Sequence, residues 1–282
     1  MNNHSMIVKI GGGPANDGNA LRGLAAEIAL VVPDPPNSPS ARQATGASEK
    51  SGSRFLVAVV HGGGSDVSSL SRRLGLSPTF SDGIRMTTEA EMDVVDMVLC
   101  GLVNKRIVRV LRSAGVNAIG ISGADSLLTG NPINDRDGSP SRTAHVSAVD
   151  AGIVLRLWEA GYVPVIASPG TDEAGRAVNI NADEAALAVG SAVRATAIIF
   201  LSDVPGIRGA DDTVISTLSV ADGEQLIEKG TITGGMVAKL RSSAGAIAAG
   251  VNHIVIGGYE KSGDLSGLLS GSIGTTIYGD QK

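Results

Sequence analysis

Residues 6–13 read Met-Ile-Val-Lys-Ile-Gly-Gly-Gly, and residues 57–64 read Val-Ala-Val-Val-His-Gly-Gly-Gly. Each stretch is a short, continuous apolar run that ends in three glycines. Such runs are typical of strands buried on both faces of a parallel sheet. Glycines at a strand end let backbone N–H groups approach a ligand closely. Because the carboxyl ends of neighbouring parallel strands face one crevice, the two glycine-rich turns together predict a ligand site there.

Four further apolar runs continue this pattern along the chain. With the first two, the expected strands are Met6–Ile10, Phe55–Val60, Asn117–Ser122, Val163–Ala167, Ala197–Leu201 and His253–Ile256. Helical stretches lie between most of them, which predicts an open α/β sheet. A boundary between two lobes is expected near residue 170, in the turn-forming stretch Ser168–Thr171.

Two helices have clear signals. The longer is expected to begin near Thr88 and to stop before Gly115, and the spacing of Thr88 and Glu91 is that of a capping box. The other is expected from Met236 to about Ala249. Two segments break the alternation of strands and helices. Pro33–Ser53 is rich in Pro, Ser and Gly, which indicates a surface insertion, and Asn131–Arg142 is polar around Asp137-Gly138, which predicts a hairpin.

The composition excludes several classes of protein. Hydrophobic residues make up 43% and charged residues 18%, a balance too apolar for a disordered chain. The net charge of −5 argues against nucleic acid as a partner, because phosphate backbones require clustered cations. The single Cys100 excludes an intrachain disulfide, and no apolar run is long enough for a membrane span. We therefore expect a cytoplasmic protein with neither a nucleic acid nor a membrane partner.

Several polar residues sit where the predicted strands end. Lys9 precedes the first glycine turn and is placed to reach a bound phosphate, although a tight turn alone would look similar. His61 precedes the second turn and either acts as a base or orients the backbone. Arg85, just before the long helix, either clamps a carboxylate or is a solvated surface residue. The sequence alone leaves these alternatives open.

The C-terminal half contains a second group of such residues. Asn179, Asn181 and Asp183 stand together at a predicted helix start, where one helix cap would account for only one of them. The loop Asp203–Ile207 follows an apolar strand and suits either a nucleotide-binding loop or an ordinary turn. Lys239 lies on the first turn of the helix that opens behind Gly234-Gly235, as a further cation for anionic oxygens.

Taken in order, these segments resemble the amino acid kinase family, and within it the acetylglutamate kinases. The resemblance covers nearly the whole chain. It rests on KIGGG (9–13), VVHGGGSDV (59–67), DGIRMTTEAEMDVVDMVLCGLVNK (82–105), GYVPVIAS (161–168), NINADEAALAV (179–189), FLSDVPGI (200–207) and EQLIEKGTITGGMVAKL (224–240).

The resemblance implies a three-layer α/β/α sandwich with a mainly parallel, eight-stranded sheet. Residues 1–170 would form an N-terminal lobe for amino-acid binding and dimerisation, and residues 171–282 a C-terminal lobe for ATP. The implied reaction is transfer of the ATP γ-phosphate to the side-chain carboxylate of N-acetyl-L-glutamate, a step of arginine biosynthesis. Mg²⁺ would accompany the ATP, with no metal site on the protein itself.

The resemblance also implies roles for individual residues. Lys9 and Lys239 would stabilise the transferring phosphoryl group, and Asp183 would hold both lysines. Gly11 and Gly12 would donate N–H groups to the γ-phosphate. Gly63, Gly64, Arg85 and Asn179 would bind the acyl amino acid. The nucleotide pocket would be formed by Asp203, Val204, Pro205, Gly206, Ile207, Arg208, Thr231, Ile232 and Thr233.

The chain also departs from the family pattern. After Asn131 a glycine-rich stretch is missing and Thr143-Ala144-His145-Val146 stands instead, so the acyl pocket is the part least defined by the resemblance. The first strand begins close to the N-terminus, without the helix used by arginine-inhibited hexamers. We therefore expect a homodimer that arginine does not inhibit.

Two other functions compete with acetylglutamate kinase. Residues 97–106 (MVLCGLVNKR) also resemble kinases that phosphorylate carrier-protein-linked aminoadipate or glutamate, although the compact SDGIRMTT (81–88) and NINAD favour the acetylglutamate enzymes. The third possibility is a non-catalytic sensor of amino acids or nucleotides with the same fold. Retention of both Lys9 and Lys239 argues against that possibility.

Overall fold

The computed structural model describes residues 4–33, 54–81, 83–135 and 138–280. The expected insertion Pro33–Ser53 lies outside these residues except for Pro33. Asp82 and Asp137 also lie outside them. The statements below concern the described part of the chain.

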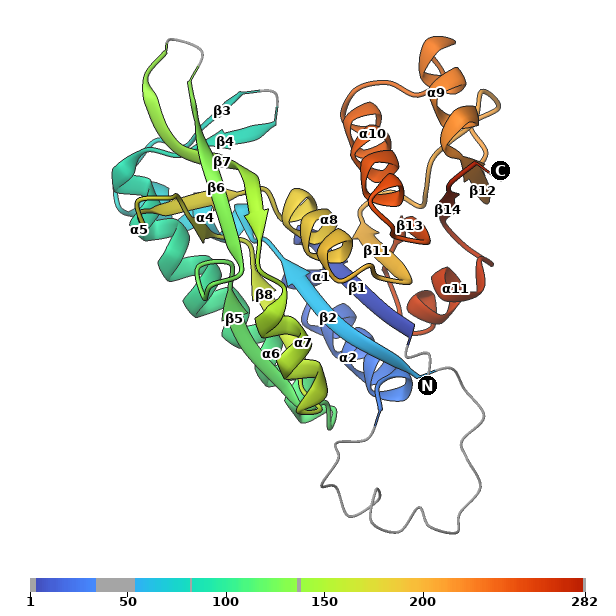
Figure 1. Ribbon diagram of the computed structural model, residues 1–282, viewed down its shortest axis with the longest axis horizontal. Coiled ribbons are helices and arrows are strands. Elements are labelled where there is room, and N and C mark those ends of the chain that lie inside the picture. The colour runs from blue at the N-terminus through green and yellow to red at the C-terminus, as the bar shows by residue number, and fades with distance from the viewer. Residues whose placement is uncertain (1–3, 34–53, 82, 136–137, 281–282) are drawn as a thin grey trace.

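One eight-stranded sheet forms the centre of the molecule (Figure 1). Its strands are, in spatial order, β12 (Thr217–Ser219), β14 (Thr275–Tyr278), β13 (His253–Gly258), β11 (Ala197–Ser202), β1 (His4–Ile10), β2 (Phe55–His61), β8 (Val163–Ala167) and β5 (Ala118–Ser122). Neighbouring strands run parallel except β13 and β14. All six expected strands are present, within two residues of their expected ends.

Helices cover both faces of this sheet. Along β1, Met6, Val8 and Ile10 belong to one apolar cluster and Ile7 to the other, which is why the strand reads as a continuous apolar run. The first cluster includes residues of α1 (Gly12–Asn16), α2 (Gly18–Val31), α4 (Gly64–Arg73), α5 (Glu89–Asp96), α6 (Asn104–Ser113) and α11 (Asp264–Ser270). The second includes residues of α7 (Gly152–Glu159), α8 (Ala182–Ala192), α9 (Val220–Glu228) and α10 (Gly235–Ala248). The expected three-layer α/β/α sandwich is confirmed.

Two smaller β units lie outside the central sheet. The expected hairpin is present as β6 (Leu128–Asn134) paired antiparallel with β7 (Pro140–Val149). β9 (Gly170–Thr171) and β10 (Ala177–Ile180) complete it into a small closed sheet. A separate antiparallel pair is formed by β3 (Thr79–Ser81) and β4 (Ile84–Met86). In Figure 1 these units rise at the upper left and α10 at the upper right, with α8 between them.

The long helix that begins after Thr88 is not α-helical throughout. Its capping box is present: Glu91 N donates to Thr88 Oγ1 at 3.2 Å, and Thr88 N donates to Glu91 Oε2 at 3.3 Å. Between α5 and α6, however, a π-helical segment η1 (Met97–Val103) interrupts the α-helix. The expected long helix is therefore present from Glu89 to Ser113, with a π-helical segment that the sequence did not reveal. Asn104, the first residue after the π-helical segment, is fully buried.

The central sheet continues across the expected lobe boundary near residue 170. β1 pairs with β2 on one side and with β11 on the other, so both halves of the chain share one sheet. No helix of the described residues has both the length and the apolarity needed to cross a bilayer.

Candidate functional site

Two lysines from distant parts of the chain meet on one carboxylate. Lys9 lies near the end of β1, and its Nζ is 2.6 Å from Asp183 Oδ1. Lys239 lies in α10, one residue beyond the first turn where it was expected, and its Nζ is 3.0 Å from Asp183 Oδ2. The two lysine side chains are only 16% and 19% exposed. Two ammonium groups against one carboxylate leave a surplus of positive charge here.

Asp183 is held in place by the start of α8. Asn181 caps this helix, and its side-chain oxygen accepts a hydrogen bond from Asp183 N at 2.8 Å. Burial alone would raise the pKa of the Asp183 carboxyl, but the charges of Lys9 and Lys239 outweigh it, so the pKa lies below its usual value. Asp183 is therefore ionised at neutral pH and can hold both ammonium groups.

The first glycine turn corrects one expectation. Gly11 N already donates to Leu201 O at 3.0 Å, so this N–H is not free for a γ-phosphate. A side chain at Gly11 is excluded as well, because its Cβ would lie 2.6 Å from Leu201 O. Gly12 lines the pocket beside Lys9, and a Cβ there would meet open space. The part of this turn that is open to a ligand therefore begins at Gly12.

The second glycine turn is fixed by a buried histidine. His61 Nδ1 donates to Gly62 O at 2.9 Å, and His61 Nε2 accepts from Asn104 Nδ2 at 3.1 Å. Burial lowers the pKa of His61 to about 4, so its ring is neutral at pH 7. Asn104 Nδ2 also lies 2.8 Å from Val165 O. Of the two readings left open for His61, the contacts favour orientation of the backbone over base catalysis.

Arg85 lies at the far side of the same pocket and is 8% exposed. Its Nη2 donates to Gly64 O at 3.0 Å and to Ser68 Oγ, and the Phe80 ring lies 4.8 Å from its guanidinium carbon. Its Nη1 is 3.8 Å from Glu91 Oε1 and has no hydrogen-bond partner among the described residues. Arg85 is thus not a solvated surface residue, and its guanidinium adds positive charge to this side of the pocket.

Asn179 is connected to Arg85 through two threonines. Asn179 Nδ2 donates to Thr87 Oγ1 at 2.8 Å, and Thr87 N donates to Thr143 Oγ1 at 2.9 Å. Thr143 Oγ1 in turn donates to Arg85 O at 2.6 Å. This chain of hydrogen bonds links β10, β7 and β4 at one wall of the pocket.

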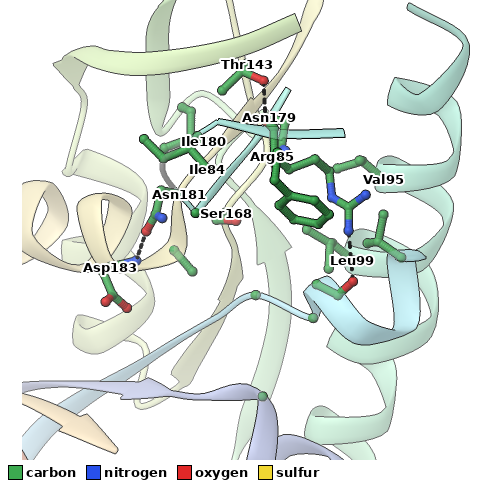
Figure 2. A pocket seen from close by; sticks show the side chains of 18 of the residues that line it. Ile84, Arg85, Val95, Leu99, Thr143, Ser168, Asn179, Ile180, Asn181 and Asp183 are labelled. Atoms are coloured by element: carbon green, nitrogen blue, oxygen red, sulfur yellow. Dashed lines mark hydrogen bonds between the residues drawn. The ribbon is translucent and has the colours of Figure 1, made fainter. Parts of the chain in front are cut away.

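These groups enclose one pocket of about 290 Å³ (Figure 2). Figure 2 shows Asp183 and Arg85 on opposite sides of it, with Asn179 and Thr143 above and Leu99 beside the Arg85 guanidinium. Apart from Gly11 and Lys239, the expected catalytic and amino-acid-binding residues line it: Lys9, Gly12, Gly63, Gly64, Arg85, Asn179 and Asp183. The pocket therefore has a cationic end at Lys9 and another at Arg85.

Only some of the residues expected to bind the nucleotide line a pocket. A second pocket of about 690 Å³ lies between α8 and α10 and includes Asp183 and Lys239. A third, of about 350 Å³, includes Gly13 and Asp203. The expected nucleotide positions that line none of the three pockets are Gly11, Val204, Pro205, Gly206, Ile207, Arg208, Thr231, Ile232 and Thr233.

Three of those positions have other partners in the structure. Ile207 and Ile232 are buried in the second apolar cluster, so their side chains serve the core. Arg208 Nη1 lies 2.6 Å from Asp212 Oδ2 within its own loop. At these positions a bound nucleotide would have to be recognised mainly by the backbone.

Sequence reasoning did not single out Phe80 and Ser168, which line the pocket, or Ser68, which contacts Arg85, and it assigned Glu91 only to a helix cap. Phe80 lies on a three-residue strand, too short for a pattern, and Ser68 is an ordinary helix residue. Ser168 follows β8 directly, so the rule that polar residues at strand ends form sites would have found it. Glu91 has a capping-box signature that explains only its contact with Thr88 and not its approach to Arg85.

The described residues contain no group of three His, Cys, Asp or Glu side chains arranged to hold a metal ion. The surplus positive charge at Lys9 and Lys239 is suited to an anionic ligand.

Comparison with known proteins identifies relatives over most of the chain. A sequence model described as the amino acid kinase family matches residues 5–258. An acetylglutamate kinase from Methanopyrus kandleri is 43% identical over 221 residues, which are 76% of this chain and 87% of that protein. An acetylglutamate kinase from Chloroflexus aurantiacus is 41% identical over 204 residues, or 71% of this chain and 79% of that protein.

Solved structures share the fold at lower identity. N-acetylglutamate synthase from Neisseria gonorrhoeae, complexed with coenzyme A and N-acetyl-glutamate, has a TM-score of 0.80 at 22% identity and covers 99% of this chain and 60% of its own. The protein smu.665 from Streptococcus mutans has a TM-score of 0.74 at 24% identity, covering 98% of each chain. With the family model and the identities above, these findings show that the chain belongs to the amino acid kinase family.

Proposed function

We propose that this protein is an acetylglutamate kinase, which transfers the γ-phosphate of ATP to the side-chain carboxylate of N-acetyl-L-glutamate in arginine biosynthesis. One observation carries the proposal: a single pocket has Lys9, joined to Lys239 through Asp183, at one end and the buried Arg85 at the other. N-acetylglutamate has two carboxylates separated by a short chain. The sequence relatives named above are acetylglutamate kinases, which supports this substrate.

The substrate would bind with its α-carboxylate toward Arg85. Arg85 lines this end of the pocket with its Nη2 fixed by Gly64 O, and its guanidinium would supply the positive charge. Asn179 and the backbone of Gly63 and Gly64 line the same part of the pocket and would orient the acylamino group. The side-chain carboxylate would then point toward Lys9. This orientation places the nucleophile next to the positive charge.

The reaction needs positioned charge more than proton transfer. A carboxylate oxygen attacks the γ-phosphorus, the bond from phosphorus to the bridging oxygen breaks, and ADP leaves with the electron pair. The carboxylate is already ionised at pH 7, so no general base is required. Lys9 and Lys239 would neutralise the charge that spreads over the phosphoryl oxygens, and Gly12 N–H would add a donor. Asp183 would keep the two ammonium groups together.

The nucleotide would approach from the C-terminal part of the chain. We assign amino-acid binding and dimer formation to residues 1–170 and ATP binding to residues 171–282, with the loop Asp203–Arg208 and the segment Thr231–Thr233 beside the nucleotide. Mg²⁺ would enter with ATP, held largely by its phosphates, and would neutralise phosphate charge. A cytoplasmic homodimer completes the proposal.

A hydroxylamine assay tests this function. Hydroxylamine converts an acyl phosphate into a hydroxamate, so the protein with MgATP and N-acetylglutamate should yield acetylglutamyl hydroxamate. N-acetylaspartate, one methylene shorter, serves as the matched control and should react far more slowly. Hydroxamate only from a carrier-linked glutamate or aminoadipate would replace the proposed substrate. Binding of the substrates without any product would indicate a non-catalytic sensor.

A further inference from the structure

Arg106 touches the helices that open behind both glycine-rich turns. It is the third residue of α6. Its Nη1 donates to Asn16 Oδ1 at 3.0 Å, and its Nη2 donates to Asp66 Oδ1 at 3.2 Å. Asn16 is the last residue of α1, which begins directly after Gly11. Asp66 lies in the first turn of α4, which begins at Gly64.

A further side-chain contact closes this arrangement. Asn16 Nδ2 donates to Ser65 Oγ at 2.8 Å, so α1 and α4 also touch directly. Arg106, Asn16, Ser65 and Asp66 together make what we call the turn clamp. The clamp joins the turn that would face the phosphate donor to the turn that would face the acceptor.

Beyond the strand ends, backbone hydrogen bonds of the described residues do not join the two turns. β1 and β2 are paired as far as Ile10 and His61, the residues just before the glycines. Among the backbone hydrogen bonds of the described residues, none joins the segment Gly11–Asp17 to the segment Gly62–Arg73. The spacing of the two turns beyond the sheet therefore depends on side chains.

The geometry of arginine suits this task. A guanidinium is planar and presents its N–H groups in a fixed fork, so two acceptors on its two Nη atoms are held at a fixed separation. Asp66 also depends on this contact, because its Oδ2 is buried without a hydrogen-bond partner among the described residues. The Arg106 side chain is 32% exposed, so replacing it should leave the core intact.

The base of the clamp is itself fixed. Asn104, two residues before Arg106, is fully buried and donates to His61 Nε2 and Val165 O. The π-helical segment η1 ends directly before Asn104. Through Asn104, α6 is anchored to His61, the residue just before the second glycine turn. Through Arg106, it contacts the helices that follow both turns.

We propose that Arg106 is a positioning residue that sets the distance between the phosphate-donor turn and the acceptor turn. This inference rests on the proposed kinase function. In-line transfer is sensitive to the separation of the reacting atoms, and an error near 1 Å can cost about 100-fold in rate. Loss of the clamp should therefore lower kcat more than it raises either KM.

Three variants separate this role from a general effect of charge. Arg106→Ala removes both contacts. Arg106→Lys keeps the charge but cannot hold two acceptors in a fork. Arg109→Ala is the matched control, because Arg109 is an exposed arginine on the same helix. We expect Arg106→Ala to lower kcat roughly 10- to 100-fold, with each KM changed less than about 3-fold. Arg106→Lys should be intermediate, and Arg109→Ala should match the wild type.

Hydrogen–deuterium exchange supplies a second readout that does not need activity. In Arg106→Ala, amides of both 11–17 and 62–67 should exchange faster than in the wild type and in Arg109→Ala. Unchanged exchange in either segment would overturn the clamp. The positioning role would also be overturned if Arg106→Ala exchanged faster but kept the wild-type kcat, or if Arg106→Lys had full wild-type activity. A wild-type protein without turnover would overturn the proposed function instead, while the exchange result would still decide whether the clamp holds the turns together.

Discussion

Single side chains carry the charge of the site. Lys9 and Lys239 share Asp183, and both are largely shielded from water, where electrostatic interactions with a ligand are stronger than at the surface. The sequence could indicate each lysine separately because both accompany glycine-rich turns. It could not show that their ammonium groups meet, since more than two hundred residues separate them and only the folded sheet brings them together.

Replacing either lysine tests the catalytic assignment. Lys9→Met and Lys239→Met keep much of the side-chain volume and remove the charge, so we expect turnover to fall by about 10²–10³-fold or more. The thermal transition should move little, because the remaining lysine still pairs with Asp183. The control is Lys229→Met, at an exposed position after α9. A variant of either site lysine with wild-type turnover would contradict the assignment.

His61 makes a prediction about stability and pH. Burial lowers its pKa from 6.5 to about 4, so between these values the unfolded chain binds a proton that the folded chain does not. Stability is therefore lost as the pH falls below 6.5, by about 2 kcal/mol between pH 7 and pH 5.

The variant His61→Gln isolates this contribution. Glutamine can still accept a hydrogen bond from Asn104 and does not titrate. Between pH 7 and pH 5, the unfolding free energy of the variant, measured in urea, should therefore fall by about 2 kcal/mol less than that of the wild type. Because the other histidines are common to both proteins, only the difference between them matters. Parallel pH profiles for the two proteins would show that His61 is not buried in its neutral form.

The sequence predicted some helices and strands more accurately than others. Strands buried on both faces, such as β8, read as apolar runs and were predicted nearly to the residue. The short strands β3 and β12 have three residues each, too few for a pattern to emerge. The π-helical segment was missed because its residues still continue the apolar spacing of the flanking helix. The direction of the Gly11 N–H also could not be predicted, because it depends on the neighbouring strand β11.

Asn104 tests the importance of the π-helical segment. Asn104→Ala would leave His61 Nε2 without its donor and remove the contact with Val165 O, both in the buried interior. We expect urea unfolding to show a loss of at least about 2 kcal/mol, together with a higher KM for N-acetylglutamate because the second glycine turn loosens. Ser113→Ala, at an exposed position of the same helix, should cost little. Equal stability of the two variants would refute this anchoring role.

The molecule as a whole is organised around the carboxyl ends of its parallel strands. The glycine turns after β1 and β2 meet at this edge, with the hairpin units on one side and α10 on the other (Figure 1). The fold and the family could be predicted because many motifs occur in a fixed order along the chain. The nucleotide contacts could not be predicted as reliably, because residues such as Ile207 that follow a family motif are directed by packing into the core.

The structure of the protein with N-acetylglutamate and a non-hydrolysable ATP analogue tests the central proposal most directly. We expect the α-carboxylate on the Arg85 guanidinium, and the side-chain carboxylate facing a γ-phosphate that both Lys9 and Lys239 contact. A substrate bound in the reverse orientation, or a γ-phosphate remote from the two lysines, would contradict the proposed transfer.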